Sequence, residues 1–115
     1  VSGNARVSGN ARVYGDALVY GDALVYGDAL VYGDAWVSGN ARVSSDAEVL
    51  WISKIGSRLG TTTFFKSKKG IEVSCGCFLG TIEEFGSKVN ATHGDSKHGD
   101  VYRHAIEIAK LQIGG

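Results

Sequence analysis

A six-residue repeat occupies residues 1–48 and constrains the fold of the chain more than any other feature. Each unit reads V-x-G-[ND]-A-x, except that Ser45 replaces the glycine in the last unit. A period of six fits neither an α-helix nor a heptad coiled coil, and it is typical of stacked β-solenoid coils. The units begin at Val1, Val7, Val13, Val19, Val25, Val31, Val37 and Val43.

The residue types within each unit explain how such coils form. Val and Ala recur at fixed positions, so they can point inward and stack on copies of themselves. Gly followed by Asn or Asp tolerates positive φ and supplies a tight corner. We therefore expect a parallel β-solenoid over residues 1–48. So few coils bury little surface by themselves, so we also expect something to cap or flank them.

The repeat resembles the hexapeptide-repeat left-handed β-helix family, in which three hexads make one triangular coil. The resemblance covers all of residues 1–48 and implies left-handed coils. Many such proteins are acyltransferases that use a His on or beside the coils, and their carbonic-anhydrase relatives bind zinc through several His. Residues 1–48 contain neither His nor Cys. Both activities are therefore disfavoured, since a fold alone does not confer function.

The central hexads carry large apolar residues at their variable positions. Hexads three apart should share a face, which predicts that Tyr14 and Leu18 lie directly beside Tyr32 and Trp36 on one continuously apolar face. Such surfaces usually mark interfaces. We expect self-association through these four residues, with a trimer favoured by the family resemblance. The alternative is that the C-terminal unit folds back over this face.

Residues 49–115 lose the hexad pattern and predict a separate α+β unit. Runs of β-branched and aromatic residues favour strands, and Thr81-Ile82-Glu83-Glu84 has the form of a capping box that begins a helix. Gly94 is the expected end of that helix. The predicted order is β-β-β-α-α: strands at Val49–Ile55, Thr61–Ser67 and Ile71–Phe78 with a turn at Lys68-Lys69-Gly70, then helices from Thr81 to His93 and from about Asp100 to Ile113.

This second unit is similar to the C-terminal domain of hexapeptide-repeat proteins common in bacteriophages and prophages. The resemblance spans roughly residues 50–113, and Gly99 departs from its pattern and could delay the second helix. No settled activity attaches to that domain, but many small phage proteins sequester nucleotide signals of bacterial defence. The residues that carry the resemblance are Gly56-Ser57-Arg58, Thr61-Thr62-Thr63-Phe64-Phe65, Cys75-Gly76-Cys77-Phe78, Thr92-His93-Gly94-Asp95, Lys97 and Tyr102.

The net charge of zero hides an asymmetry between the two parts. Residues 1–48 hold three Arg against six acidic residues, and residues 49–115 hold nine Lys or Arg against six acidic residues. The second unit is basic enough for a small anion but has no basic tract for a nucleic-acid polymer or a membrane surface. The chain has no long apolar run and no signal-like leader, so we expect a soluble protein in the cytoplasm of an infected or lysogenic bacterium.

Gly56-Ser57-Arg58 followed by Thr61, Thr62 and Thr63 is the most suggestive cluster. A turn exposes backbone N–H groups, Arg forms paired hydrogen bonds with phosphate or carboxylate, and hydroxyls can donate. We therefore predict that Ser57, Arg58 and the three threonines bind an anion. The alternative is an ordinary hairpin, because consecutive Thr residues also suit a half-exposed strand.

His93, Lys97 and Tyr102 are further candidate ligand-binding residues. His93 could contact a base or ribose, although a His near a helix C-terminus can also serve only to stabilise the helix dipole. Tyr102 or Phe64 could stack on a base. The second reading of His93, paired with Asp95, is a small hydrolase, but no second acid or base is evident.

Cys75 and Cys77 could in principle join His93 and His98 in a metal site. Their C-x-C spacing is shorter than the usual C-x₂₋₄-C, and on a strand both side chains share the face of the apolar Ile71 and Val73. We interpret them as buried structural cysteines and expect neither metal nor cofactor.

These observations favour a non-enzymatic binding protein. Its solenoid would self-associate, and its basic unit would bind or sequester a small anionic, nucleotide-like ligand as a phage counter-defence sponge. The alternative is a structural module with a trimerising stalk and a protein-binding head.

Overall fold

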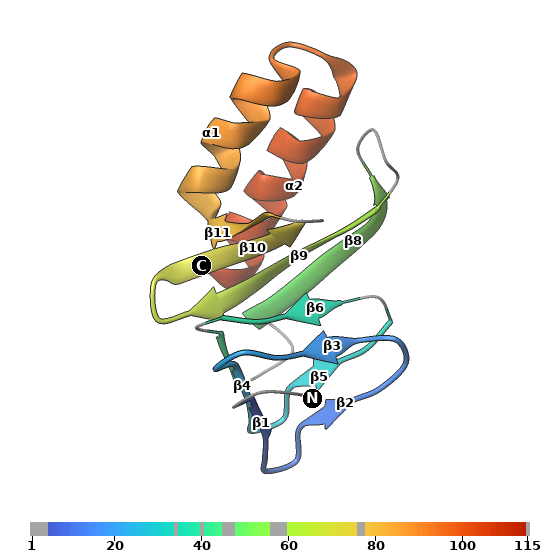
Figure 1. Cartoon of the computed structure of the whole chain (residues 1–115), viewed down its shortest axis with the longest axis vertical. Coiled ribbons are helices and arrows are strands. Elements are labelled where there is room, and N and C mark those ends of the chain that lie inside the picture. The colour runs from blue at the N-terminus through green and yellow to red at the C-terminus, as the bar shows by residue number, and fades with distance from the viewer. Residues whose placement is uncertain are drawn as a thin grey trace.

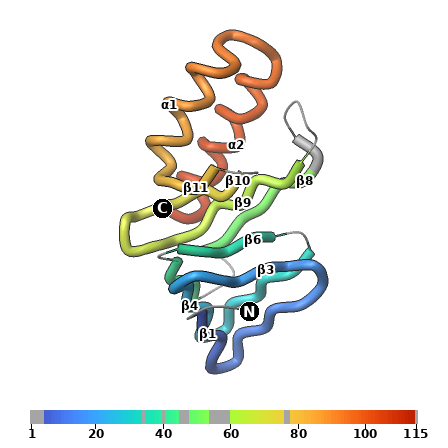
Figure 2. Tube along the Cα trace, in the orientation of Figure 1, coloured from blue at the N-terminus to red at the C-terminus, as the bar shows by residue number. Residues whose placement is uncertain are grey.

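The chain forms three stacked layers: a β-solenoid, an antiparallel sheet and a pair of helices (Figure 1). The computed structural model describes residues 5–33, 35–39, 41–44, 48–55, 60–75 and 78–114. The trace in Figure 2 winds coil upon coil from the N-terminal end toward the sheet. The predicted fold class, a β-solenoid followed by a small α+β unit, is confirmed.

The described solenoid strands are short and pair in parallel with the strand three hexads away. Arg6 N donates to Ala23 O at 3.0 Å, and Leu24 N donates to Ala41 O at 2.9 Å, so each coil is bonded to the next. The sheets are β1-β4-β7, β2-β5 and β3-β6. The strands are β1 (Arg6–Val7), β2 (Arg12–Val13), β3 (Leu18–Val19), β4 (Leu24–Val25), β5 (Leu30–Val31), β6 (Trp36–Val37) and β7 (Arg42–Val43).

The corners of the coils require glycine for two separate reasons. Gly27 has φ +61°, a conformation that side chains rarely adopt. In addition, a Cβ on Gly27 would lie 2.5 Å from Ser44 O in the next coil. The repeated glycine therefore allows the chain to turn and lets neighbouring corners approach closely.

The expected single apolar face is wrong in one respect. Tyr14 follows β2 and Leu18 begins β3, and the turn at Gly15 and Asp16 lies between them. Because Val and Ala of one hexad both point inward, the corner falls inside the hexad. Each flat face therefore combines the end of one hexad with the start of the next, and the apolar surface wraps around a corner.

Burial of the inward Val column depends on which coil a residue occupies. Val25, Val37 and Val43 are fully buried, whereas Val7 and Val13 in the first coil are partly exposed. The coils nearer the sheet have a packed layer on both sides. No described segment packs on the side of the first coil that faces away from the sheet. The same residue type thus contributes differently at the two ends of the solenoid.

Above the solenoid lies a four-stranded antiparallel sheet in the order β11-β10-β9-β8. The prediction of three strands is wrong, because Phe78 begins a further strand in which Phe78 pairs with Cys75 and Gly80 pairs with Val73. A Cβ on Gly80 would lie 3.0 Å from both the Phe78 ring and the Glu84 carboxylate. The strands are β8 (Val49–Ile55), β9 (Gly60–Ser67), β10 (Gly70–Cys75) and β11 (Phe78–Thr81).

This sheet is covered on both faces. Phe65 packs with the Val and Ala columns of the solenoid, and its neighbour Phe64 packs with the helices. A hydrogen bond of 3.1 Å from Trp36 N to Thr63 Oγ1 joins the solenoid to β9. The α+β unit therefore covers the end of the solenoid, and the alternative that it folds back over the aromatic surface is wrong.

The two helices cover the far face of the sheet (Figure 1). Helix α1 (Ile82–His93) begins with the predicted capping box and ends at Gly94, which has φ +51°. Helix α2 (Lys97–Ile113) begins three residues earlier than predicted, with Ser96 as its N-cap. Gly99 does not delay the helix; it lies buried in the first turn, where a Cβ would meet Gly94 O at 2.6 Å. Neither described helix is long and apolar enough to cross a membrane.

Candidate functional site

Four large apolar side chains form a ridge along one corner of the solenoid. We call Tyr14, Leu18, Tyr32 and Trp36 the ridge. The Tyr14 and Tyr32 rings stack with centroids 5.0 Å apart and planes 8° from parallel. Leu18 and Trp36 are partners in the β3–β6 register. Each ridge side chain remains at least 40% exposed. The predicted neighbours do meet, and they face solvent.

Trp51 of β8 extends the ridge into the α+β unit, which the sequence analysis missed. Its ring meets Tyr32 edge-on, with centroids 4.7 Å apart. Its indole Nε1 also lies over Gly33, 3.3 Å from where a Cβ would stand. Trp51 lies two residues after Val49, and alternation along β8 places both on the solenoid side. The alternation of residues along β8 could therefore have predicted the position of Trp51 from the sequence.

The stacking geometry limits what the ridge can bind. Parallel stacking turns the faces of Tyr14 and Tyr32 toward each other, and the Trp51 edge covers part of the remaining Tyr32 surface. Little of the Tyr32 ring face is then left for a nucleobase or sugar. The exposed apolar surface of the ridge suits packing against another protein.

The predicted threonine cluster is not gathered around a common pocket. Thr62 and Thr63 are each only 1% exposed. The Thr62 hydroxyl donates to Cys75 Sγ at 3.2 Å, and Thr63 Oγ1 accepts from Trp36 N. Thr61 Oγ1 lies 3.0 Å from Ser53 Oγ. Residues Ser57 and Arg58 lie outside the described residues, as does Cys77.

His93 and Tyr102, by contrast, are brought together where α1 passes into α2. Their rings stack with centroids 5.5 Å apart, and the His98 ring lies 5.9 Å from that of His93. Tyr102 is almost fully buried and meets Phe85 edge-on at 5.6 Å. Tyr102 thus anchors the partly exposed His93 to the aromatic core between the helices and the sheet.

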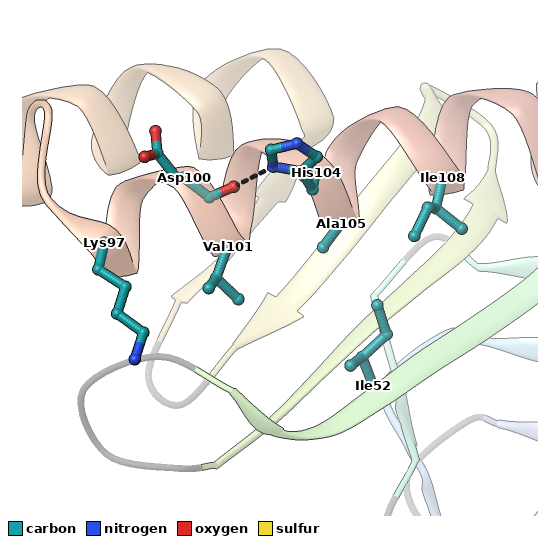
Figure 3. Close-up of a pocket in the computed structure, with 7 residues that line it drawn as sticks. All are labelled: Ile52, Lys97, Asp100, Val101, His104, Ala105 and Ile108. Atoms are coloured by element: carbon teal, nitrogen blue, oxygen red, sulfur yellow. Dashed lines mark hydrogen bonds between the residues drawn. The ribbon is translucent and has the colours of Figure 1, made fainter.

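Lys97 lies apart from that pair, at the end of a groove of about 420 Å³ between α2 and β8 (Figure 3). Val101 and Ile108 point from α2 toward Ile52 of β8. This groove was not predicted from the sequence. It could have been predicted from a second stripe of residues along α2, spaced alternately four and three residues apart beside the buried face of the helix. The groove is lined by Ile52, Lys97, Asp100, Val101, His104, Ala105 and Ile108.

Glu48 forms a charged joint between the last solenoid coil and β9. Its Oε1 accepts from Ser44 N at 2.7 Å and from Ser44 Oγ at 2.6 Å, and Lys66 Nζ donates to its Oε2 at 3.0 Å. Burial raises the pKa of Glu48, but the Ser44 hydrogen bonds and the Lys66 ammonium outweigh it, so the pKa lies below its ordinary value.

The described residues contain no group of three or more His, Cys, Asp and Glu placed to hold a metal ion. Cys75 packs at the edge of the core between the sheet and the helices, beside Ile71 and Val73. Its thiol sulfur accepts the hydrogen bond from Thr62. These contacts place Cys75 in a structural setting.

Comparison with known proteins finds a similarity in the first part of the chain only. Three overlapping segments, residues 1–13, 11–27 and 23–39, match the family described as YdcK Beta solenoid repeat. No curated protein and no solved structure gives a significant match. The matched segments cover about a third of the chain, and they are similar to that repeat over the coils that the structure shows stacked in parallel.

Proposed function

We propose that this protein is a non-enzymatic binding protein that self-associates through the ridge and holds a small anionic ligand in its α+β unit. The observation that carries the proposal is the ridge, in which the stacked Tyr14 and Tyr32 and the paired Leu18 and Trp36 are all exposed. Use as a phage counter-defence sponge for a nucleotide-like signal in the bacterial cytoplasm is part of the proposal.

Self-association is supported by the continuity of the apolar surface. Tyr14, Tyr32 and Trp51 run in contact from the first coil into β8. Contiguous apolar surface of this kind costs free energy in water, and burial against a second copy removes that cost. A trimer is the arrangement that we favour, by analogy with the hexapeptide-repeat proteins.

Ligand binding is supported by the groups around the α1–α2 junction. The partly exposed His93 and His98 offer ring nitrogens close to the first turn of α2, where the helix dipole favours anions. Because Thr62 and Thr63 are buried, we propose that the ligand is held at this junction. The binding roles of Ser57, Arg58 and Thr61 stay predictions from the sequence.

Self-association can be tested by native mass spectrometry and light scattering. We expect the protein to be oligomeric and the double substitution Tyr32→Ser, Trp36→Ser to shift it to monomers. Tyr26→Ser is the matched control, because Tyr26 is 39% exposed on another face and Tyr32 is 42% exposed. A wild-type monomer at micromolar concentration, or an equal effect of the control, would refute self-association through the ridge.

Ligand binding can be tested by incubating the protein with nucleotides and recovering them after denaturation. A sequestering protein should release them unaltered, whereas a hydrolase acting through His93 should release products. We expect His93→Ala to weaken retention, and Gln112→Ala, on the exposed side of α2 and outside the groove, to leave it unchanged. Failure to retain any nucleotide would count against this part of the proposal.

A protein-binding head on a trimerising stalk is a second candidate, favoured by the outer stripe of α2. Ile108 is 50% exposed and Leu111 is 79% exposed, one turn apart on the same side of the helix. If the biological activity is retained after His93→Ala but lost after Leu111→Ser, this second candidate is favoured.

A further inference from the structure

The described walls of the groove between α2 and β8 are largely aliphatic. Ile52 forms one side, and Val101, Ala105 and Ile108 contribute aliphatic side chains to the other (Figure 3). Its volume of about 420 Å³ lies within the range of about 300–1,000 Å³ typical of small-molecule sites. The space therefore suits the apolar part of a small ligand.

The charge in the groove is concentrated at one end. Lys97 stands there in the first turn of α2, and no hydrogen bond or ion pair engages its ammonium within the described part of the chain. Asp100 also lines the groove, but its carboxylate turns away from Ile52 and bonds to Arg103 Nη2 at 2.7 Å. The carboxylate of Asp100 is therefore neutralised by Arg103, and Lys97 gives this end a positive potential.

The polar capacity of the remaining lining is small. His104 Nδ1 is engaged with Asp100 O at 2.7 Å, one helical turn back. A polyphosphate needs several donors arranged around its oxygens, whereas a single carboxylate can be satisfied by one ammonium and water. The groove has too few donors for a polyphosphate, whereas its one ammonium is sufficient for a carboxylate.

From this combination we infer that the groove binds a small amphipathic anion: an unbranched apolar chain along Ile52, Val101 and Ile108, with its carboxylate at Lys97. The inference deepens the proposed function and rests on it for the anionic character of the ligand. It replaces a nucleotide by a fatty-acid-like monoanion as the occupant of this particular site.

The test is calorimetric titration of the full chain with hexanoate, octanoate and decanoate, with amide NMR shifts to locate the site. Each added methylene buried in the groove should raise the affinity about three- to fourfold until the groove is filled. Octanoate should bind about three- to tenfold more tightly than 1-octanol because of its contact with Lys97. The largest amide shifts should fall at Ile52, Val101 and Ile108.

Two matched pairs of variants separate charge from shape. Lys97→Gln should abolish the advantage of octanoate over 1-octanol, while Lys110→Gln, on the same helix outside the groove, should preserve it. Ile108→Ser should weaken both probes, and Leu111→Ser, which is more exposed and does not line the groove, should weaken neither. All four positions are largely exposed, so the variants should fold.

Equal affinity for octanoate and 1-octanol, no dependence on chain length, or shifts located elsewhere would overturn the inference. Inorganic phosphate, as a probe without an apolar chain, should not compete with octanoate. If nucleotides are retained through His93 while octanoate does not bind, the inference fails and the proposed function stands. If octanoate binds and no nucleotide is retained, the groove stands and the nucleotide-like ligand is wrong.

Discussion

The two sides of the central sheet are stabilised in different ways. On the solenoid side the core is a set of repeated small residues, with Val25 on Val43 and Ala columns beside them. On the helix side the core is a cluster of unlike aromatic rings, in which Phe85 meets both Phe64 and Tyr102 edge-on. Repeated residues bury surface only when a further layer lies above and below them. Unlike rings can enclose one another and need no repetition.

The comparison shows how the α+β unit completes the end of the solenoid that faces the sheet. Phe65 and Val49 close the last coil as a capping layer, and Trp36 N and Glu48 add hydrogen bonds across the same boundary. Capping layers are generally required in repeat proteins, because the terminal repeat otherwise exposes its apolar face. The unit that we propose to bind the ligand is therefore also the unit that stabilises the coils.

Phe65→Ala should have the largest effect, because it removes a fully buried ring from the boundary between solenoid and sheet. We expect a loss of about 3–5 kcal/mol in the free energy of unfolding, measured in denaturant. Phe85→Ala is the control in the helix layer and should cost a similar amount. In hydrogen exchange, the solenoid amides should lose protection before the helix amides in Phe65→Ala but not in Phe85→Ala. Equal protection of the solenoid in both variants would mean that the coils do not depend on the cap.

A matched pair of valines tests whether burial within the solenoid depends on position. Val13 and Val31 are partners on adjacent coils, but Val31 is fully buried and Val13 is partly exposed. Val31→Ala should lower the free energy of unfolding by about 1.5–3 kcal/mol, and Val13→Ala by less than about 1 kcal/mol. Chemical denaturation measures both, and equal losses would contradict the difference between the two ends.

The smallest expected effect is at the charged joint, and it depends on pH. Glu48→Gln should lower the free energy of unfolding by about 1–2 kcal/mol at neutral pH, because the carboxylate accepts two bonds from Ser44 and one from Lys66. A lowered folded-state pKa gives stability that is fully present above the unfolded-state pKa and is lost as pH falls through the folded value. The difference between wild type and variant should therefore vanish in acid. A difference that persists unchanged in acid would exclude this ionic origin.

The hexad repeat was sufficient to predict which strands pair, because a period of six and a three-sided coil place Val13 on Val31. The repeat was not sufficient to locate the corner of each coil. The corner lies within a hexad, because the inward Val and Ala of one hexad stand on either side of the turn. The fourth strand was missed because Gly80, within a four-residue strand, carries no strand signal. Its pairing with Val73 is set by the neighbouring strand rather than by local preference.

The candidate site was harder to predict than the fold. Thr62 and Thr63 were predicted to bind an anion through their hydroxyls, with an ordinary half-exposed strand as the alternative. The sheet is covered on both faces, so two adjacent threonines are both buried. His93 and Tyr102 were each predicted to bind a ligand, but their contact with each other was not predicted, because it depends on the angle between two helices, which no local pattern encodes. The ligand-binding role of both residues stays a prediction.

The partly open first coil, with Val7 and Val13 less buried than their counterparts above, has a consequence for how the molecule folds. The coil next to the sheet packs on Phe65 and Val49, and each further coil is hydrogen-bonded to its neighbour. Among the described residues, coil formation should then propagate away from the cap, with residues 5–20 ordering after the coils next to the sheet. Changes in the number of coils on the side away from the sheet would therefore leave the packing of the α+β unit on its neighbouring coil unchanged.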